Sequence, residues 1–170
     1  MKIGILGHSQ VKYLDFDDEN IQRFFRYGAT LSNISTSKCY YELIDFNPDL
    51  VIVFLGSTDI VEYGYNQTKE IVKKLFELKF KILKEIKPVH GVKFLEIEPR
   101  KSYLDVNRRD YTSVRNGVAN KLKTINHSDF ISLSSHGLDE TCIGPDGIHL
   151  NYSGSQIIVK TILDFIKNVL

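Results

Sequence analysis

The sequence has 170 residues, of which 42% are hydrophobic and 25% charged, as in an ordinary soluble globular domain. Its 22 basic and 21 acidic residues leave a formal net charge of +1, which disfavours nucleic acid or an anionic membrane as the main partner. No apolar run reaches transmembrane length, so membrane insertion is not expected. The apolar run at the N-terminus is too short for a secretion signal, which indicates a cytoplasmic protein or a domain excised from a longer one.

Short apolar runs alternate with amphipathic segments along the chain. The runs predict five β-strands, over 2–6, 21–27, 50–55, 92–97 and 129–133. The third run has six consecutive apolar residues, as expected of a central parallel strand that is buried on both faces. Apolar spacing predicts helices over 30–46, 67–86, 111–125 and 155–169. This alternation predicts one α/β domain over residues 1–170, a three-layer α/β/α sandwich around a five-stranded parallel sheet.

The most informative stretch lies near the end of the sequence, where Asp146 and His149 stand three residues apart in a loop rich in Gly and Pro. An aspartate at this spacing can accept the Nδ1 proton of the imidazole and leave Nε2 free to act as a base. Without a nucleophile nearby, such a pair more often serves only to tie its own loop. The pair therefore predicts catalysis only if the fold brings a nucleophile to it.

Ser9 is the candidate nucleophile because it directly follows the first predicted strand, and ligands of open parallel sheets bind beyond the carboxyl ends of strands. The alternative is that Ser9 only caps the following segment. Gly28 and the segment 56–59 also follow predicted strands, so one edge of the sheet would gather them. For acyl transfer, Ser9 would attack, His149 would accept its proton and Asp146 would orient the ring. The backbone amides of Ser9 and Gly28 would face the oxyanion.

In order and spacing, these residues resemble the SGNH (GDSL-type) hydrolase family over nearly the whole chain. The Gly-Asp-Ser block of the family corresponds to 7–9, its second-block glycine to Gly28, its Gly-x-Asn-Asp to 56–59 and its Asp-x-x-His to 146–149. The resemblance implies a flavodoxin-like sandwich and an esterase that forms an acyl-enzyme on Ser9. Its substrate would be a carboxylic ester, such as a small acyl ester or an O-acetyl ester of a carbohydrate. Neither a cofactor nor a metal ion is expected.

Two residues depart from the family pattern. Thr58 stands where the family has the asparagine whose side-chain amide completes the oxyanion hole, and a hydroxyl is shorter and can direct its proton elsewhere. We expect Thr58 to be the third donor, and the alternative is a weakened or inactive SGNH-like module that only binds its ligand. His8 replaces the aspartate before the nucleophile. We expect a surface residue beside the turn, and the alternatives are a second proton carrier or a contact to the substrate.

The other candidate features receive structural interpretations. Asp59 is expected to order the turn after the third strand, and the Gly4-x-x-Gly7 spacing lacks the lysine of a phosphate-binding loop, which disfavours a nucleotide-binding module. Substrate choice is assigned to loops at 61–67 and 100–110, the second being basic and a candidate for a mobile loop over the site. A domain excised from a phage or mobile-element polyprotein remains a third possibility. The remaining histidines are expected to be solvated, and the two cysteines to be free thiols: His90, His127, His136, Cys39 and Cys142.

Overall fold

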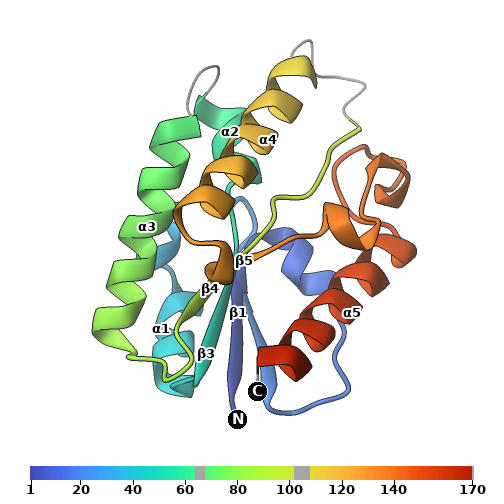
Figure 1. Ribbon diagram of the computed structural model, residues 1–170. Coiled ribbons are helices and arrows are strands. Elements are labelled where there is room, and N and C mark those ends of the chain that lie inside the picture. Colours follow the sequence, from blue (N-terminus) through green and yellow to red (C-terminus); the bar gives the residue numbers. More distant parts are fainter. Residues whose placement is uncertain (64–67, 102–107, 170) are drawn as a thin grey trace.

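A computed structural model gives the fold of residues 1–63, 68–101 and 108–169 (Figure 1). The strands in these ranges are β1 (Ile3–Gly7), β2 (Ile21–Phe25), β3 (Leu50–Phe54), β4 (Val92–Leu95) and β5 (Phe130–Ile131). The α-helices are α1 (Lys38–Phe46), α2 (Ser57–Tyr63), α3 (Thr68–Glu85), α4 (Arg108–Ile125) and α5 (Tyr152–Val169). The two loops expected to choose the substrate fall largely on 64–67 and 102–107, which lie outside the described residues.

The five strands form one parallel sheet in the order β2-β1-β3-β4-β5, which confirms the predicted fold class. This order is that of flavodoxin-like folds, in which the direction of winding changes between β1 and β3. Gly7 at the end of β1 pairs with Phe25 of β2 and with Phe54 of β3. The three strands therefore end at the same level, and the segments that follow them share one rim of the sheet.

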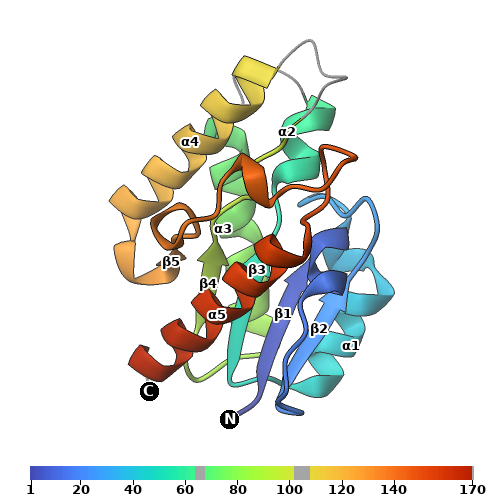
Figure 2. The same cartoon turned by 90° about the vertical axis from the view of Figure 1, so that its right-hand side faces the viewer.

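Helices cover both faces of the sheet. Figures 1 and 2 show α1, α3 and α4 on one face and α5 on the other. Val51 and Val53 belong to the apolar cluster under the first layer, whereas Ile52 and Phe54 belong to the cluster under α5. Side chains in β3 alternate between two buried layers, which explains why this strand is apolar at every position. Burial of each such side chain contributes roughly 1.5–3 kcal/mol to folding.

The helix predicted over 30–46 is wrong in its first half. Residues 30–37 form turns and a short 3₁₀ helix, and α1 begins at Lys38. The backbone N–H of Thr30 donates to the Asn33 side chain at 2.9 Å, and the Ser37 hydroxyl donates to the carbonyl of Ile34 at 2.5 Å. Such local bonds from polar side chains compete with helical backbone pairing, so the apolar spacing of this stretch does not produce a helix.

The short helices that follow β1 and β3 were not predicted from the sequence. A 3₁₀ helix, η1 (Ser9–Tyr13), follows β1, and α2 follows β3. Both begin within a few residues of a strand end, so they set the direction of the side chains at the rim. Neither has the length of an amphipathic pattern, which is why periodicity does not reveal them. Cys39 and Cys142 are free and buried, as predicted, and none of the described helices is long and apolar enough to cross a membrane.

Candidate active site

Close backbone packing fixes the start of the site at the end of β1. A Cβ atom on Gly7 would lie 2.6 Å from the carbonyl oxygen of Phe54, so a larger residue would push β1 and β3 apart. The N–H of His8 donates to the same Phe54 carbonyl at 3.4 Å, after which the chain enters η1. Ser9 is the first residue of that helix and is partly exposed. Its hydroxyl is therefore presented at the rim by a rigid strand end.

Ser9, His149 and Asp146 are brought together across the chain. The Ser9 Oγ lies 3.2 Å from His149 Nε2, and His149 Nδ1 lies 2.6 Å from an Asp146 carboxylate oxygen. The hydroxyl and the carboxylate thus lie at different nitrogens of one ring, so His149 can accept a proton on Nε2 while Asp146 holds Nδ1. We call these three residues the rim triad.

The turn that carries Asp146 also orients its carboxylate. The Asp146 Oδ1 accepts the backbone N–H groups of Ile148 and His149, each at 2.9 Å. Gly147 lies between them with φ of +73°, a left-handed conformation that favours glycine. Burial opposes ionisation of Asp146, but the hydrogen bonds from His149 and from these amides outweigh it and lower the pKa to about 2. The carboxylate is thus ionised at neutral pH.

No pattern in the sequence indicates two of the residues that contact His149 or its backbone neighbours. The side chain of Gln10, next to Ser9, hydrogen-bonds the backbone on both sides of His149. The ring of Tyr13, at the other end of η1, meets the imidazole edge-on, with 5.9 Å between centroids. These contacts join residues nearly 140 positions apart. A single glutamine or tyrosine carries no motif that indicates such a contact.

Gly28 and Thr58 reach the same rim but form no hydrogen bond with Ser9 in the described part of the chain. Gly28 lies three residues beyond the end of β2 in a left-handed turn, and Thr58 is the second residue of α2. Among the described residues, no hydrogen bond joins either of them to Ser9, and the Thr58 hydroxyl makes none. Their roles in an oxyanion hole stay predictions.

Asp59 connects two of the loops at the rim. It is fully buried, and its two carboxylate oxygens each lie 3.1 Å from the backbone nitrogen of Leu31. The residue therefore ties the segment after β3 to the loop after Gly28, besides ordering its own turn. Burial raises the pKa of the Asp59 carboxyl.

The expectation that His8 is a surface residue is wrong, because its side chain is only 3% exposed. The His8 Nδ1 accepts the N–H of Gln10 at 3.4 Å, which leaves the proton on Nε2. That nitrogen lies 3.4 Å from a Glu98 carboxylate oxygen and 3.4 Å from the Ser57 hydroxyl. We call Ser57, His8 and Glu98 the buried cluster. The sequence could not indicate it, because Glu98 follows a different strand.

Charges around Glu98 keep its buried carboxylate ionised. Burial opposes ionisation, but the neighbouring His8 imidazole and the positive charge of Arg100 outweigh it and lower the pKa of Glu98 to about 2. The Arg100 guanidinium also donates to the Ser57 hydroxyl at 3.3 Å. The cluster is thus a compact set of polar side chains around one buried carboxylate under the rim.

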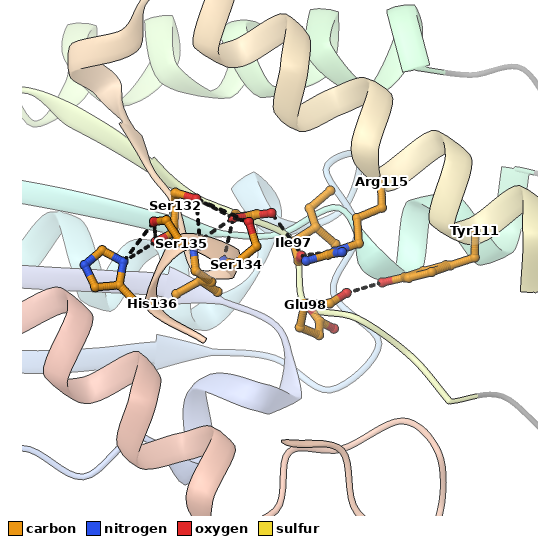
Figure 3. A network of polar contacts seen from close by, with 10 residues as sticks. Ile97, Glu98, Tyr111, Arg115, Ser132, Ser134, Ser135 and His136 are labelled. Carbon is orange, nitrogen blue, oxygen red and sulfur yellow. Dashed lines mark hydrogen bonds and ion pairs between the residues drawn. The ribbon is translucent and has the colours of Figure 1, made fainter. Parts of the chain in front are cut away.

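The segment after β4 is held from the side of α4 (Figure 3). The Tyr111 hydroxyl donates to the backbone carbonyl of Glu98 at 2.9 Å, and the Arg115 Nε donates to that of Ile97 at 2.6 Å. Glu96 accepts the N–H groups of Leu133 and Ser134 at 2.7 and 3.0 Å, which ties in the loop after β5. These bonds fix the backbone that carries Glu98.

The remaining histidines, His90, His127 and His136, are exposed, as predicted. Within residues 1–63, 68–101 and 108–169, no group of three His, Cys, Asp or Glu side chains is placed to hold a metal ion.

No protein-family model and no curated protein sequence matches the chain. Solved structures do. A GDSL-like lipase from Bacteroides thetaiotaomicron VPI-5482 has a TM-score of 0.77 at 16% identity, over 99% of this chain and 89% of that one. A carbohydrate esterase of family 3 from Talaromyces cellulolyticus has a TM-score of 0.69 at 15% identity, over 99% and 97%. An acetyl xylan esterase has a TM-score of 0.69 at 17% identity, over 96% and 98%. The chain therefore has the fold of the SGNH (GDSL-type) hydrolases.

Proposed function

We propose that the protein is a serine esterase that hydrolyses a carboxylic ester through an acyl-enzyme on Ser9. The observation that carries the proposal is the geometry of the rim triad, with 3.2 Å from Ser9 Oγ to His149 Nε2 and 2.6 Å from His149 Nδ1 to Asp146. The shared fold supports the same conclusion, because its structural neighbours include esterases and a lipase.

In the first half of the reaction, Ser9 Oγ attacks the ester carbonyl carbon while His149 Nε2 accepts the hydroxyl proton. The ionised Asp146 stabilises the imidazolium and keeps the ring in one tautomer. Collapse of the tetrahedral intermediate breaks the ester bond, and His149 gives its proton to the departing alkoxide. In the second half, water loses a proton to His149 and attacks the acyl-enzyme, which releases the acid and restores Ser9.

The developing oxyanion requires donors at the rim. We assign this role to the backbone N–H groups of Ser9 and Gly28 and to the Thr58 hydroxyl. In support, Ser9 follows β1, Gly28 follows β2 and Thr58 follows β3. The ends of these three strands lie at the same level of the sheet. The Thr58 hydroxyl is also not committed to another acceptor in the described part of the chain.

The substrate class that we propose is an ester with a small acyl group, such as an O-acetyl ester of a carbohydrate. The structural neighbours described as a carbohydrate esterase and an acetyl xylan esterase support this choice. A panel of acetylated sugars and oligosaccharides, compared with longer p-nitrophenyl esters, tests it. Faster turnover of the long acyl chains would contradict a small acyl group.

Hydrolysis of p-nitrophenyl acetate by the wild type and by a Ser9→Ala variant tests the activity itself. We expect turnover only with Ser9, and equal rates in both proteins would refute the proposal. Labelling with a fluorophosphonate probe is an independent measurement, because it requires an activated serine but no specific substrate. Mass spectrometry of the labelled peptide should place the adduct on Ser9.

One observation favours a second candidate, a module that binds an ester without hydrolysing it. Thr58 supplies a hydroxyl where the resemblance calls for an amide, and loss of one donor costs about 10² to 10³ in turnover. Such a module would bind an acetylated ligand equally well with and without Ser9, while neither protein turned it over. Binding by calorimetry beside the turnover assay separates the two candidates.

A further inference from the structure

Gln10 connects the segment of the proposed nucleophile to the segment of the proposed base. It follows Ser9 in η1, and its side-chain Nε2 donates to the carbonyl oxygen of Ile148 at 2.8 Å. Its Oε1 accepts the N–H of Leu150 at 3.0 Å. These two peptide groups lie on either side of His149. One side-chain amide therefore pairs with the backbone before and after the base, as a neighbouring strand would.

The environment of Gln10 makes this pairing specific. The residue is 1% exposed, so water does not compete for its amide. It faces one carbonyl and one N–H group, and a primary amide offers one acceptor and one donor end to match them. Loss of either bond would leave a buried polar group of the backbone without a partner, which is unfavourable. The side chain is thus held in one orientation.

Two backbone hydrogen bonds hold the loop of His149 without involving Ser9 or η1. The N–H of Gly144 donates to the His149 carbonyl at 2.7 Å within the loop, and the N–H of Lys101 donates to Gly147 at 2.9 Å from the segment after β4. Among the described residues, the side-chain hydrogen bonds that join this loop to η1 are those of Gln10, apart from the Ser9–His149 contact itself. Gln10 is therefore placed to set the distance between Ser9 and His149.

We propose that Gln10 is a positioning residue of the rim triad, which holds His149 Nε2 within reach of Ser9 Oγ. The inference rests on the proposed esterase activity and adds to it the part that aligns its two reacting groups. Proton transfer needs these two atoms within hydrogen-bond distance. A displacement on the order of 1 Å in such a site lowers the rate by about 10²-fold.

Gln10→Met tests this role, because methionine has a similar length and forms neither hydrogen bond. We expect kcat to fall about 10- to 100-fold with little change in KM, since the side chain aligns the base and does not contact the ester. Ile82→Val is the matched control, because Ile82 is fully buried in α3 and outside the site. It should lower the melting temperature and leave kcat unchanged. If Gln10→Met, like the control, lowers the melting temperature and leaves kcat unchanged, the proposal is overturned.

Gln10→Glu provides a test that depends on the hydrogen bonds alone. A neutral carboxyl group offers an O–H donor for Ile148 and a C=O acceptor for Leu150, whereas a carboxylate offers no donor. The ratio of kcat in Gln10→Glu to kcat in the wild type should therefore rise as the pH is lowered. A ratio that does not change with pH would contradict the pairing.

A measurement without substrate separates this inference from the proposed function. The His149 Nδ1–H held by Asp146 should give a downfield proton NMR signal, sharp in the wild type and in Ile82→Val. In Gln10→Met we expect the signal to broaden, because the displaced ring exchanges its proton with water. An unchanged signal would overturn the positioning role. Equal hydrolysis by wild type and Ser9→Ala would instead overturn the esterase proposal and leave the NMR result as the test of Gln10.

Discussion

The rim triad and the buried cluster contain the same kinds of residues and meet at one peptide bond, because His8 directly precedes Ser9. Each has a serine, a histidine and a carboxylate. In the rim triad, the hydroxyl and the carboxylate bind different ring nitrogens of His149. In the buried cluster, both Ser57 and Glu98 lie 3.4 Å from Nε2 of His8. A general base must accept a proton on one nitrogen while a carboxylate holds the other, so only the first arrangement fits a base that is oriented by an acid.

Burial separates the two clusters further. His149 is about a third exposed, whereas the side chains of His8 and Glu98 are 3% and 0% exposed. An ester can therefore reach the first histidine but not the second. Both carboxylates have a pKa lowered to about 2, by hydrogen bonds in Asp146 and chiefly by neighbouring charge in Glu98. A perturbed pKa alone thus does not distinguish a catalytic acid from a structural one.

Replacement of the serines should give the largest difference between the two clusters. Ser9→Ala removes the nucleophile, and we expect kcat for p-nitrophenyl acetate to fall on the order of 10⁴- to 10⁶-fold. Ser57→Ala removes a hydroxyl that only pairs His8 with Arg100, so kcat should stay within about threefold of the wild type. Steady-state kinetics of both purified variants measures this. Comparable losses would show that the buried cluster takes part in the reaction.

Replacement of the acids should give the next largest difference. Asp146→Asn keeps the shape of the side chain but presents an N–H to His149, which favours the wrong tautomer and should lower kcat by about 10⁴-fold. Glu98→Gln leaves the rim triad intact, and its kcat should change only a few-fold. The two variants are compared by kcat at one pH where both are folded. A larger loss in Glu98→Gln than in Asp146→Asn would reverse the roles assigned here.

The sequence allowed the prediction of features that depend on local pattern. The apolar run at 50–55 predicts a strand buried on both faces, and β3 is such a strand. Asp146 and His149 are close in sequence, so a turn alone can join them. The order of strands and loops then predicts that Ser9 shares their rim. The structure places Ser9 Oγ within 3.2 Å of His149, as that order implied.

Features that depend on contacts between distant segments could not be predicted. The burial of His8 depends on Glu98, which is 90 positions away, and the pairing of Gln10 depends on backbone atoms near residue 149. Neither residue belongs to a repeating pattern, so composition and spacing contain no signal for it. The prediction of a helix over 30–37 failed for another reason. Polar side chains in this stretch form hydrogen bonds with the nearby backbone, and these bonds override the apolar spacing.

Loss of His8 should affect stability more than catalysis. His8→Leu leaves the buried Glu98 carboxylate without the imidazole Nε2 group that lies 3.4 Å from it, and we expect the free energy of unfolding to fall by about 1–3 kcal/mol near neutral pH. The pKa of Glu98 is lowered to about 2 from 4.5, so its contribution to stability is complete above pH 4.5 and is lost as the pH falls toward 2. The difference between variant and wild type should therefore shrink in acid.

Urea unfolding of His8→Leu at neutral and at acidic pH measures this effect. The double variant with Glu98→Leu is the control, because removal of the buried carboxylate as well should recover much of the lost stability. A constant difference at all pH values, or no recovery in the double variant, would mean that the loss comes from packing against Phe54 and not from the contact with Glu98.

Among the proposed catalytic positions at the rim, replacement of Thr58 should give the smallest change in kcat. It tests whether the side chain of residue 58 donates to the oxyanion. If the hydroxyl donates to the oxyanion, Thr58→Val, which has the same shape without a donor, should lower kcat by about 10²-fold. Thr58→Asn supplies a longer amide donor and should raise kcat by about 10- to 100-fold, with KM little changed in both variants.

A rank order of Val, Thr, Asn in kcat would place residue 58 at the oxyanion. Equal rates for Val and Thr would mean that the hydroxyl is no donor, and a slower Asn variant would mean that the hole is shaped for the shorter side chain. Thr58 lies one residue from the buried cluster, so melting temperatures of both variants are the control that separates a lost donor from a disturbed Ser57.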